Sequence, residues 1–136
     1  MESKVILLDT GILIEFFRKK NKAKSILYQL SLQPFEFKVA AISYYEILLG
    51  SNDSQKDFWG QFFDRIQVLP FDSVAAGIAA EIYQQLKSEN QLIDIADILI
   101  GSIAISNQIS LATLNSKHFI RINKLKLVDL SFSKKP

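Results

Sequence analysis

Residues 5–10, Val5-Ile6-Leu7-Leu8-Asp9-Thr10, form an apolar run that ends abruptly in a carboxylate. A short continuous apolar segment bounded by polar residues is typical of a strand buried on both faces of a parallel sheet. An acid directly after such a strand lies in the crevice at the carboxyl ends of the strands, where open α/β sheets bind ligands. A charge buried there is costly unless a metal ion, another cation or the N–H groups of the following helix pair with it. This stretch therefore predicts the fold class and the position of a site.

The composition indicates one globular domain with few options for catalysis. The chain has 136 residues, 49% of them hydrophobic, which suits a single domain over residues 1–136. Its formal net charge of +2 does not mark a strongly basic nucleic-acid binder. The chain has no cysteine and one histidine, His118, so a disulfide framework, thiol catalysis and a multi-histidine zinc site are excluded. Carboxylates, hydroxyls, amides, lysines and arginines remain for chemistry.

The sequence shows no membrane span and no cleavable leader. The longest apolar stretch, residues 98–105, falls well short of the length that crosses a bilayer. The first strand is expected within a few residues of the N-terminus, which leaves no room for a signal peptide. We therefore expect a cytoplasmic protein that does not contact a membrane.

Predicted strands and helices alternate along the chain. Strands are expected at 5–8, 37–42, 66–69, 110–113 and 125–128, and helices at 10–17, 22–32, 43–49, 53–63, 72–86, 94–107 and 117–120. Ser43 and Asp72 are the expected N-caps of two of these helices. The alternation favours an α/β fold, a three-layer α/β/α sandwich around a mostly parallel central sheet of four to five strands.

Three acids occupy similar positions in this pattern. Asp9 follows the first strand, Glu46 is expected in the first turn of the helix after the second strand, and Asp97 in the first turn of the helix that starts near Asp94. The junctions between strands and helices meet at one edge of an α/β sheet, so the three carboxylates would repel one another. A hard divalent cation relieves that repulsion, and Mg²⁺ prefers oxygen ligands together with waters and substrate phosphates. Such a site can polarise a phosphodiester and lower the pKa of a bound water.

Each acid also has a purely structural interpretation. Asp9 can cap the helix that follows it. Glu46 would be favoured in a first turn by the helix dipole alone. Asp94 and Asp97 stand three residues apart, like an N-cap and its partner in a capping box. The case for a metal site rests on the occurrence of all three acids at equivalent junctions.

Four segments in order resemble the PIN domain family, most closely its short bacterial VapC-type toxins. These segments are Leu8-Asp9-Thr10 with Ile12-Leu13-Ile14, Ser43-Tyr44-Tyr45-Glu46-Ile47 with Gly50, Asp97-Ile98-Leu99-Ile100-Gly101, and Thr113-Leu114-Asn115-Ser116-Lys117-His118-Phe119. Each motif alone is weak, but their order and spacing cover the chain from residue 5 to about 130.

The resemblance implies an endoribonuclease that depends on Mg²⁺ or Mn²⁺. Asp9, Glu46 and Asp97 match the three most regular acids of the family, which coordinate the metal. Asn115 stands where the family often has a fourth polar or acidic residue, and His118 stands at a later position that is frequently acidic. An amide is a weaker ligand than a carboxylate, so a complete acidic quartet is not expected here.

Further residues would support this centre. Thr10 and Ser43 match small hydroxyl positions beside the first two acids, where they can orient carboxylates. Asp94 is either a supplementary ligand or a cap, and His118 is either a phosphate contact at the rim or a surface residue.

The resemblance also implies three partners: an RNA substrate, a cognate antitoxin held in a groove of the early helices, and a second copy of the chain in a homodimer. Basic residues at 18–24 and 117–126 are either RNA contacts or a solvated face. Aromatic residues at 16–17 and 58–63 are expected in the core or at an interface. The alternatives are a non-catalytic PIN-like RNA-binding or regulatory module and, more remotely, a phosphoacceptor receiver domain.

Overall fold

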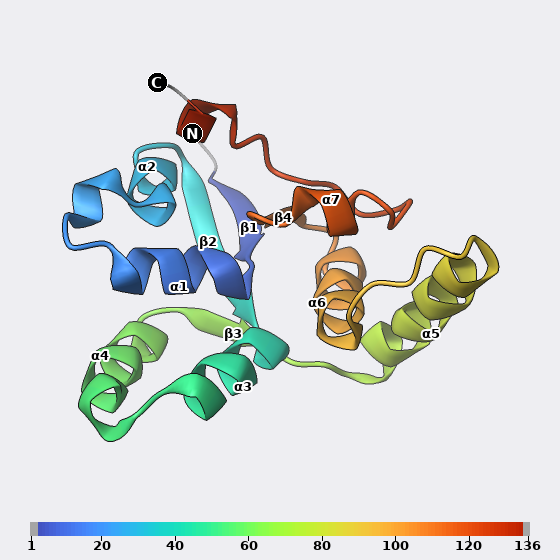
Figure 1. Ribbon diagram of the computed structural model, residues 1–136, viewed down its shortest axis with the longest axis horizontal. Coiled ribbons are helices and arrows are strands. Elements are labelled where there is room, and N and C mark those ends of the chain that lie inside the picture. Colours follow the sequence, from blue (N-terminus) through green and yellow to red (C-terminus); the bar gives the residue numbers. More distant parts are fainter. Residues whose placement is uncertain (1–2, 135–136) are drawn as a thin grey trace.

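The central sheet contains four strands, all parallel. A computed structural model describes residues 3–134, and Figure 1 shows the sheet at the centre of the molecule. The strands are β1 (Lys4–Leu8), β2 (Phe35–Ala40), β3 (Gln67–Leu69) and β4 (Ser110–Ala112), in the spatial order β3-β2-β1-β4. The parallel α/β fold predicted from the first strand is therefore confirmed.

Strand β1 is buried on both faces, as its apolar run predicts. Ile6, Leu7 and Leu8 are all 0% exposed. Leu7 packs into the hydrophobic cluster on one side of the sheet, while Ile6 and Leu8 pack into the cluster on the other. Successive side chains of a strand point to opposite faces, so only a strand with helices on both sides needs apolar residues at every position.

Helices cover both faces of the sheet and complete the three layers. One face carries α1 (Thr10–Arg18), α2 (Ile26–Ser31) and α4 (Asp53–Asp64), and the other carries α5 (Ser73–Ser88) and α6 (Ile95–Ser106). Figure 1 shows these groups to the left and right of the strands. Two further helices lie at the carboxyl edge of the sheet: α3 (Ala41–Gly50) follows β2 directly, and α7 (Ser116–Phe119) follows β4 after a loop of residues 113–115.

Two helix starts differ from the predictions. Residues 22–32 do not form one helix, because the Ser25 hydroxyl accepts the Tyr28 N–H at 3.1 Å and starts α2 anew after a short 3-10 turn, Lys22–Lys24. Ser43 is not the N-cap of α3. Strand β2 ends at Ala40, so α3 starts at Ala41 and Ser43 lies buried inside its first turn. Asp72 caps α5 as predicted, since its carboxylate accepts the Ala75 N–H at 3.0 Å.

The fifth strand predicted at 125–128 does not form. This segment makes one isolated parallel bridge, between Leu127 and Leu111 of β4. The Leu111 N–H donates to the Lys126 carbonyl at 2.9 Å, and the Val128 N–H donates to the Leu111 carbonyl at 2.8 Å. The segment cannot extend further because the Leu125 N–H is already bonded to the Ile122 carbonyl in a turn. A last 3-10 turn, Ser131–Lys134, ends the described chain. Within residues 3–134, no helix is long and apolar enough to cross a membrane.

Candidate active site

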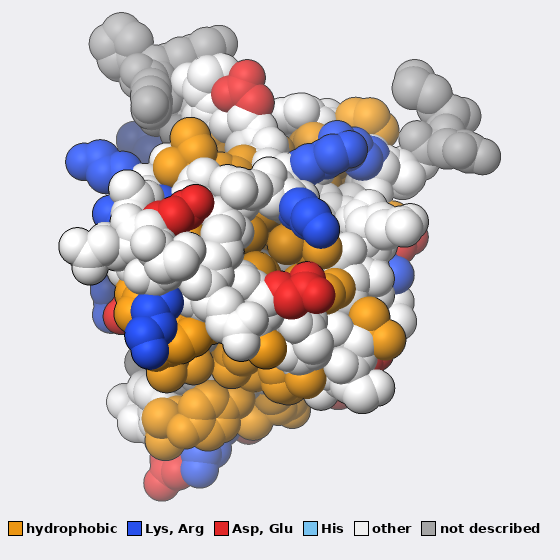
Figure 2. All heavy atoms as spheres, turned by 90° about the vertical axis from the view of Figure 1, so that its right-hand side faces the viewer, with side chains coloured by type: hydrophobic (Ala, Val, Ile, Leu, Met, Phe, Trp, Pro, Cys, Tyr) orange, Lys and Arg blue, Asp and Glu red, His pale blue; other side chains and the backbone are white. Residues whose placement is uncertain are grey.

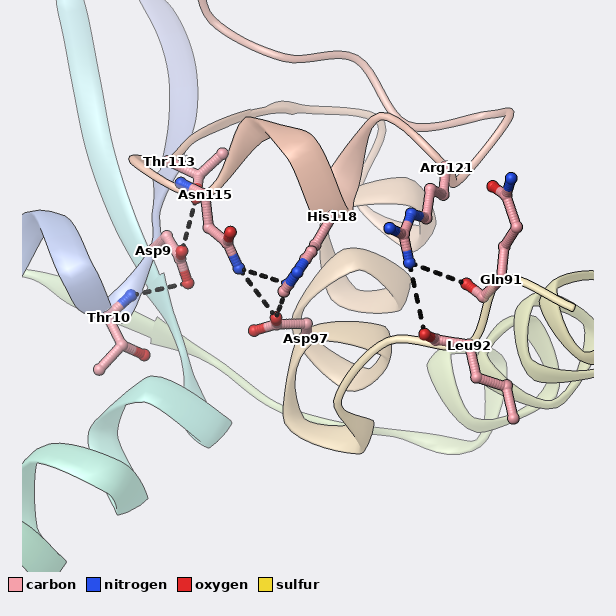
Figure 3. Close-up of polar contacts among 9 residues, drawn as sticks. All are labelled: Asp9, Thr10, Gln91, Leu92, Asp97, Thr113, Asn115, His118 and Arg121. Carbon is pink, nitrogen blue, oxygen red and sulfur yellow. Dashed lines mark hydrogen bonds and ion pairs between the residues drawn. The ribbon is translucent and has the colours of Figure 1, made fainter.

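Asp9 lies at the junction of β1 and α1, where it is 6% exposed. One carboxylate oxygen, Oδ1, accepts the N–H of Thr10 at 2.8 Å, so Asp9 is the N-cap of α1. The other oxygen, Oδ2, accepts the Thr113 hydroxyl at 2.6 Å (Figure 3). The capping interpretation of Asp9 is therefore correct. It leaves lone pairs on both carboxylate oxygens free for a cation.

Burial raises the pKa of Asp9 above its ordinary value, because water no longer solvates the ionised form. The hydrogen bonds from Thr113 and Thr10 lower this pKa, and the nearby charge of Glu46 raises it. The net result is a carboxylate whose negative charge is incompletely compensated by the protein.

Glu46 lies in the second turn of α3, not the first turn expected from the sequence, because the helix starts at Ala41. The helix dipole acts mainly within the first turn, so it does not explain this acid. The Thr10 hydroxyl donates to Glu46 Oε1 at 2.7 Å. The Ser43 and Thr10 hydroxyl oxygens are 2.8 Å apart. A carboxylate only accepts and each hydroxyl has one proton, so Ser43 completes the chain by donating to Thr10. Thr10 and Ser43 thus hold Glu46 in place.

Asp97 lies in the first turn of α6, as predicted, and its pKa is affected by the other acids. Its pKa is raised from 3.8 to about 6, first by burial and then by the charges of Asp9, Asp94 and Glu46, while His118 lowers it. Asp94 precedes α6 but its side chain makes no capping hydrogen bond, so the capping box expected from Asp94 and Asp97 is absent. Asp94 is exposed and acts on Asp97 through its charge.

Asn115 and His118 approach Asp97 from the start of α7. Asn115 Nδ2 donates to Asp97 Oδ2 at 3.4 Å and lies 2.9 Å from His118 Nδ1. His118 Nδ1 is itself 3.9 Å from Asp97 Oδ2 (Figure 3). The Asn115 amide thus presents its nitrogen, not its oxygen, to the carboxylate. His118 is half-exposed at the rim and lies beside one of the acids, Asp97.

Thr113 is the residue whose role the sequence does not reveal. Its hydroxyl donates to Asp9 and also accepts the N–H of Asn115 at 2.9 Å. Its side chain is 5% exposed. The available signal was its place directly after β4 in the fourth family-like segment, two residues before Asn115. A threonine there is also compatible with ordinary strand propensity, so the signal was not decisive.

The donor set fits a hard divalent cation. Asp9, Glu46 and Asp97 offer only carboxylate oxygens, and in residues 3–134 no Lys or Arg forms an ion pair with any of them. Within the same range, no three acidic or histidine side chains are close enough to form a closed metal cage. Mg²⁺ does not require one, because it is usually held by one or two carboxylates and keeps several waters. Burial and, to a smaller extent, the neighbouring acids raise the pKa values of Asp9 and Asp97, and a bound cation would stabilise the ionised form of both carboxylates.

The comparisons with known proteins agree with this fold. The family model "PIN domain" matches residues 6–125. Ribonuclease VapC1 of Methanocaldococcus jannaschii is 31% identical over 131 residues, covering 94% of this chain and 90% of that protein. The tRNA(fMet)-specific endonuclease VapC of Shigella flexneri is 28% identical over 130 residues, covering 92% and 97%. The crystal structure of VapBC-1 from nontypeable Haemophilus influenzae matches with a TM-score of 0.78 at 25% identity, covering 93% and 98%.

This chain belongs to the PIN domain family. The resemblance carried by the four sequence segments is therefore confirmed, and so is the three-layer fold that it implied.

Proposed function

We propose that this protein is a divalent-metal-dependent endoribonuclease and the toxin of a VapBC-type toxin–antitoxin pair. The observation that carries the proposal is that Asp9, Glu46 and Asp97 come from three different elements and interact, since the pKa of Asp97 is raised first by burial and then by the charges of Asp9, Asp94 and Glu46. Relatives that match nearly the whole chain are ribonucleases of the VapC type, which supports RNA as the substrate. The cytoplasmic location expected from the sequence is part of the same proposal.

The proposed metal ligands are Asp9, Glu46 and Asp97. Mg²⁺ or Mn²⁺, when bound, stabilises the charge that develops on a phosphodiester and makes water more acidic. Thr113 and the Thr10 N–H orient the two oxygens of Asp9. Thr10, backed by Ser43, orients Glu46. Five polar side chains are thus fixed by hydrogen bonds before substrate arrives, which is the preorganisation that a catalytic centre needs.

Asn115 and His118 act on the third carboxylate in this proposal. The Asn115 amide nitrogen faces Asp97 Oδ2, so Asn115 is a positioning residue for that oxygen, not an oxygen ligand. His118 Nδ1 accepts a hydrogen bond from the same amide nitrogen, which requires the imidazole tautomer with its proton on Nε2. Asp94 adds negative charge next to Asp97 and would strengthen attraction for the cation without touching it.

The activity is tested with purified protein and a labelled single-stranded RNA. The account expects endonucleolytic cleavage in Mg²⁺ or Mn²⁺ and none in excess chelator, with recovery when the metal is restored. A non-catalytic PIN-like module would bind RNA but leave it intact under all three conditions. Cleavage that continues in chelator would instead contradict the metal dependence.

An apolar hollow next to the early helices suits the proposed antitoxin. A hollow of about 520 Å³ is lined by Leu8, Phe16, Leu27, Glu36, Phe37, Phe58, Gln61, Phe62, Arg65 and Ile66, which belong to or flank β1, β2, α1, α2 and α4. The neighbouring Trp59 and Phe63 are 3% and 9% exposed, so these two aromatics belong to the core and not to an interface. An apolar segment of the antitoxin would fill the hollow. Phe62→Glu should weaken inhibition by the cognate antitoxin and preserve RNA cleavage.

The outer face of α3 is the proposed homodimer contact. Tyr45, Leu48 and Leu49 are 61%, 46% and 71% exposed, and their spacing places them on one side of the helix. Figure 2 shows hydrophobic side chains gathered at the lower end of the molecule, the end where α3 and α4 lie in Figure 1. Exposed apolar patches of this kind mark interaction surfaces.

A further inference from the structure

A second hollow, of about 480 Å³, follows one side of α1 away from the acids. It is lined by Gly11, Ile14, Glu15, Arg18, Lys19 and Leu114. Four of these residues lie in α1 and Lys19 is its C-cap, and their helical spacing places all five in one stripe along that helix. Leu114 faces them from the loop that follows β4. The hollow is therefore a trough between α1 and this loop.

The inner end of the trough opens at the acidic centre. Gly11 directly follows Thr10, which bonds to Glu46, and Leu114 directly follows Thr113, which bonds to Asp9. A polymer bound with one phosphodiester at the acids would have a continuous path into the trough. From Gly11 to Arg18 the helix rises about 10 Å, comparable to about three stacked nucleotides.

The outer end of the trough offers one uncommitted positive charge. Glu15 is occupied on both oxygens, since Oε1 accepts the Ile26 N–H at 3.0 Å and Oε2 lies 3.8 Å from Lys19 Nζ. Arg18 is exposed and, among the described residues, forms no ion pair. A guanidinium presents a planar fork of donors that matches a phosphate group.

The trough also has an apolar wall. Leu114 is 49% exposed although the residues on either side of it are tied into the site. Together with Ile14 it provides a surface against which a nucleobase can lie, while Arg18 holds a backbone phosphate. Base contact beside phosphate contact is the usual combination in sites for single-stranded nucleic acid.

We propose that this trough is a subsite for single-stranded RNA, which holds the nucleotides next to the scissile phosphodiester with Arg18 on a backbone phosphate and Ile14 and Leu114 against a base. This subsite rests on the proposed ribonuclease function, and it specifies where the RNA lies next to the acids. It separates Arg18 from its neighbour Lys19, which is already paired with Glu15.

The test measures binding of a fluorescent oligoribonucleotide by anisotropy in chelator, so that no cleavage occurs. Arg18→Ala should weaken binding roughly tenfold at low salt. It should also reduce the slope of log affinity against log salt by about 0.7, the loss of one phosphate contact to a single strand. Lys87→Ala removes the same charge from the end of α5, on the opposite face of the sheet, and should leave both quantities unchanged.

A second variant blocks the trough without removing charge. A Cβ at Gly11 would meet no atom within 4 Å, so a side chain can start there without a clash, and Gly11→Leu would narrow the inner end. We expect a higher KM for RNA, an unchanged affinity for Mn²⁺ and an unchanged melting temperature. If Arg18→Ala and Gly11→Leu both bind RNA as Lys87→Ala does, the subsite is wrong. If the wild-type protein binds RNA through the trough but never cleaves it with metal present, the subsite stands and the proposed ribonuclease function fails.

Discussion

The Thr113 hydroxyl donates to Asp9 Oδ2 at 2.6 Å and connects two residues that are 104 positions apart in the chain. Both stand one residue beyond the end of a strand, Asp9 after β1 and Thr113 after β4. The two strands are neighbours in register, with Leu8 opposite Ala112, so the next residues along each strand meet. The pairing of β1 with β4 therefore places the Thr113 hydroxyl within hydrogen-bond distance of Asp9.

Replacement of this donor should impair the site more than the fold. Thr113→Val keeps the shape of the side chain but leaves Asp9 Oδ2 without its hydroxyl partner, which raises the Asp9 pKa further. We expect a 10- to 100-fold loss of Mn²⁺ affinity or of kcat/KM, about the range for residues that orient metal ligands. Thr113→Ser, which retains the hydroxyl, is the matched control. Equal activity of the Val and Ser variants would show that the contact is dispensable.

The amide of Asn115 sets the number of negative charges at the site. Asn115→Asp would replace a donor to Asp97 with another acid, so repulsion in the metal-free protein would increase. We expect a lower melting temperature in chelator and a tighter Mn²⁺ affinity, both measured on the same preparation. Asp129→Asn, at an exposed position far along the chain, controls for a general effect of charge. A variant that loses Mn²⁺ affinity would contradict the assignment of Asn115 as a donor.

The raised pKa of Asp97 predicts how the stability of the metal-free protein depends on pH. The pKa of Asp97 is about 6 in the folded state against an ordinary value of 3.8 in the unfolded chain, so between these pH values the folded state binds more protons than the unfolded state. Its contribution to the free energy of unfolding therefore falls as pH rises from about 4 to about 6, and the loss is complete above pH 6. The Asp97 carboxyl should therefore make the melting temperature in chelator lower at pH 7 than at pH 5.

Two changes should remove that loss of stability. Asp97→Asn deletes the charge, so the melting temperature in chelator at pH 7 should exceed that of the wild type. Mg²⁺ added to the wild type at pH 7 should raise the melting temperature through preferential binding to the folded state. If Asp97→Asn is less stable than the wild type at pH 7 in chelator, the charge on Asp97 is not the destabilising element.

The exposed face of α3 predicts an effect on assembly. Leu49→Glu places a charge on the proposed dimer contact and should shift the protein toward the monomer in light scattering at a fixed concentration. Leu32→Glu is a closely matched control, because Leu32 is 70% exposed against 71% for Leu49 and lies at the end of α2. If both variants keep the mass of the wild type, α3 does not form the contact.

The sequence predicts those features that depend on local pattern. The apolar run at residues 5–8 was sufficient to predict a strand buried on both faces, and Asp9 directly after it lies at the carboxyl edge of the sheet as expected. The boundary between β2 and α3 was placed two residues late, because Ala40, Ala41 and Ile42 are apolar in succession and give no turn signal. This error assigned Ser43 to a cap and Glu46 to a first turn.

Features that depend on register could not be predicted. The contact between Thr113 and Asp9 follows from the pairing of β1 with β4, which the alternation of elements does not specify. The orientation of the Asn115 amide depends on His118 and Asp97, which approach it from two helices. The segment 125–128 has the composition of a strand, but a turn at Ile122 limits it to one bridge.

The most direct test of the account is Asp9→Asn, assayed for RNA cleavage with saturating Mg²⁺ or Mn²⁺. The amide preserves the shape of the side chain and an oxygen that can accept the Thr10 N–H, so the melting temperature should remain close to that of the wild type. Cleavage should fall by about 100-fold or more, equivalent to about 3 kcal/mol of transition-state stabilisation. Asp53→Asn, which alters a surface pair with Lys56, should cleave as the wild type does. Full activity of a folded Asp9→Asn variant with metal present would contradict the central claim.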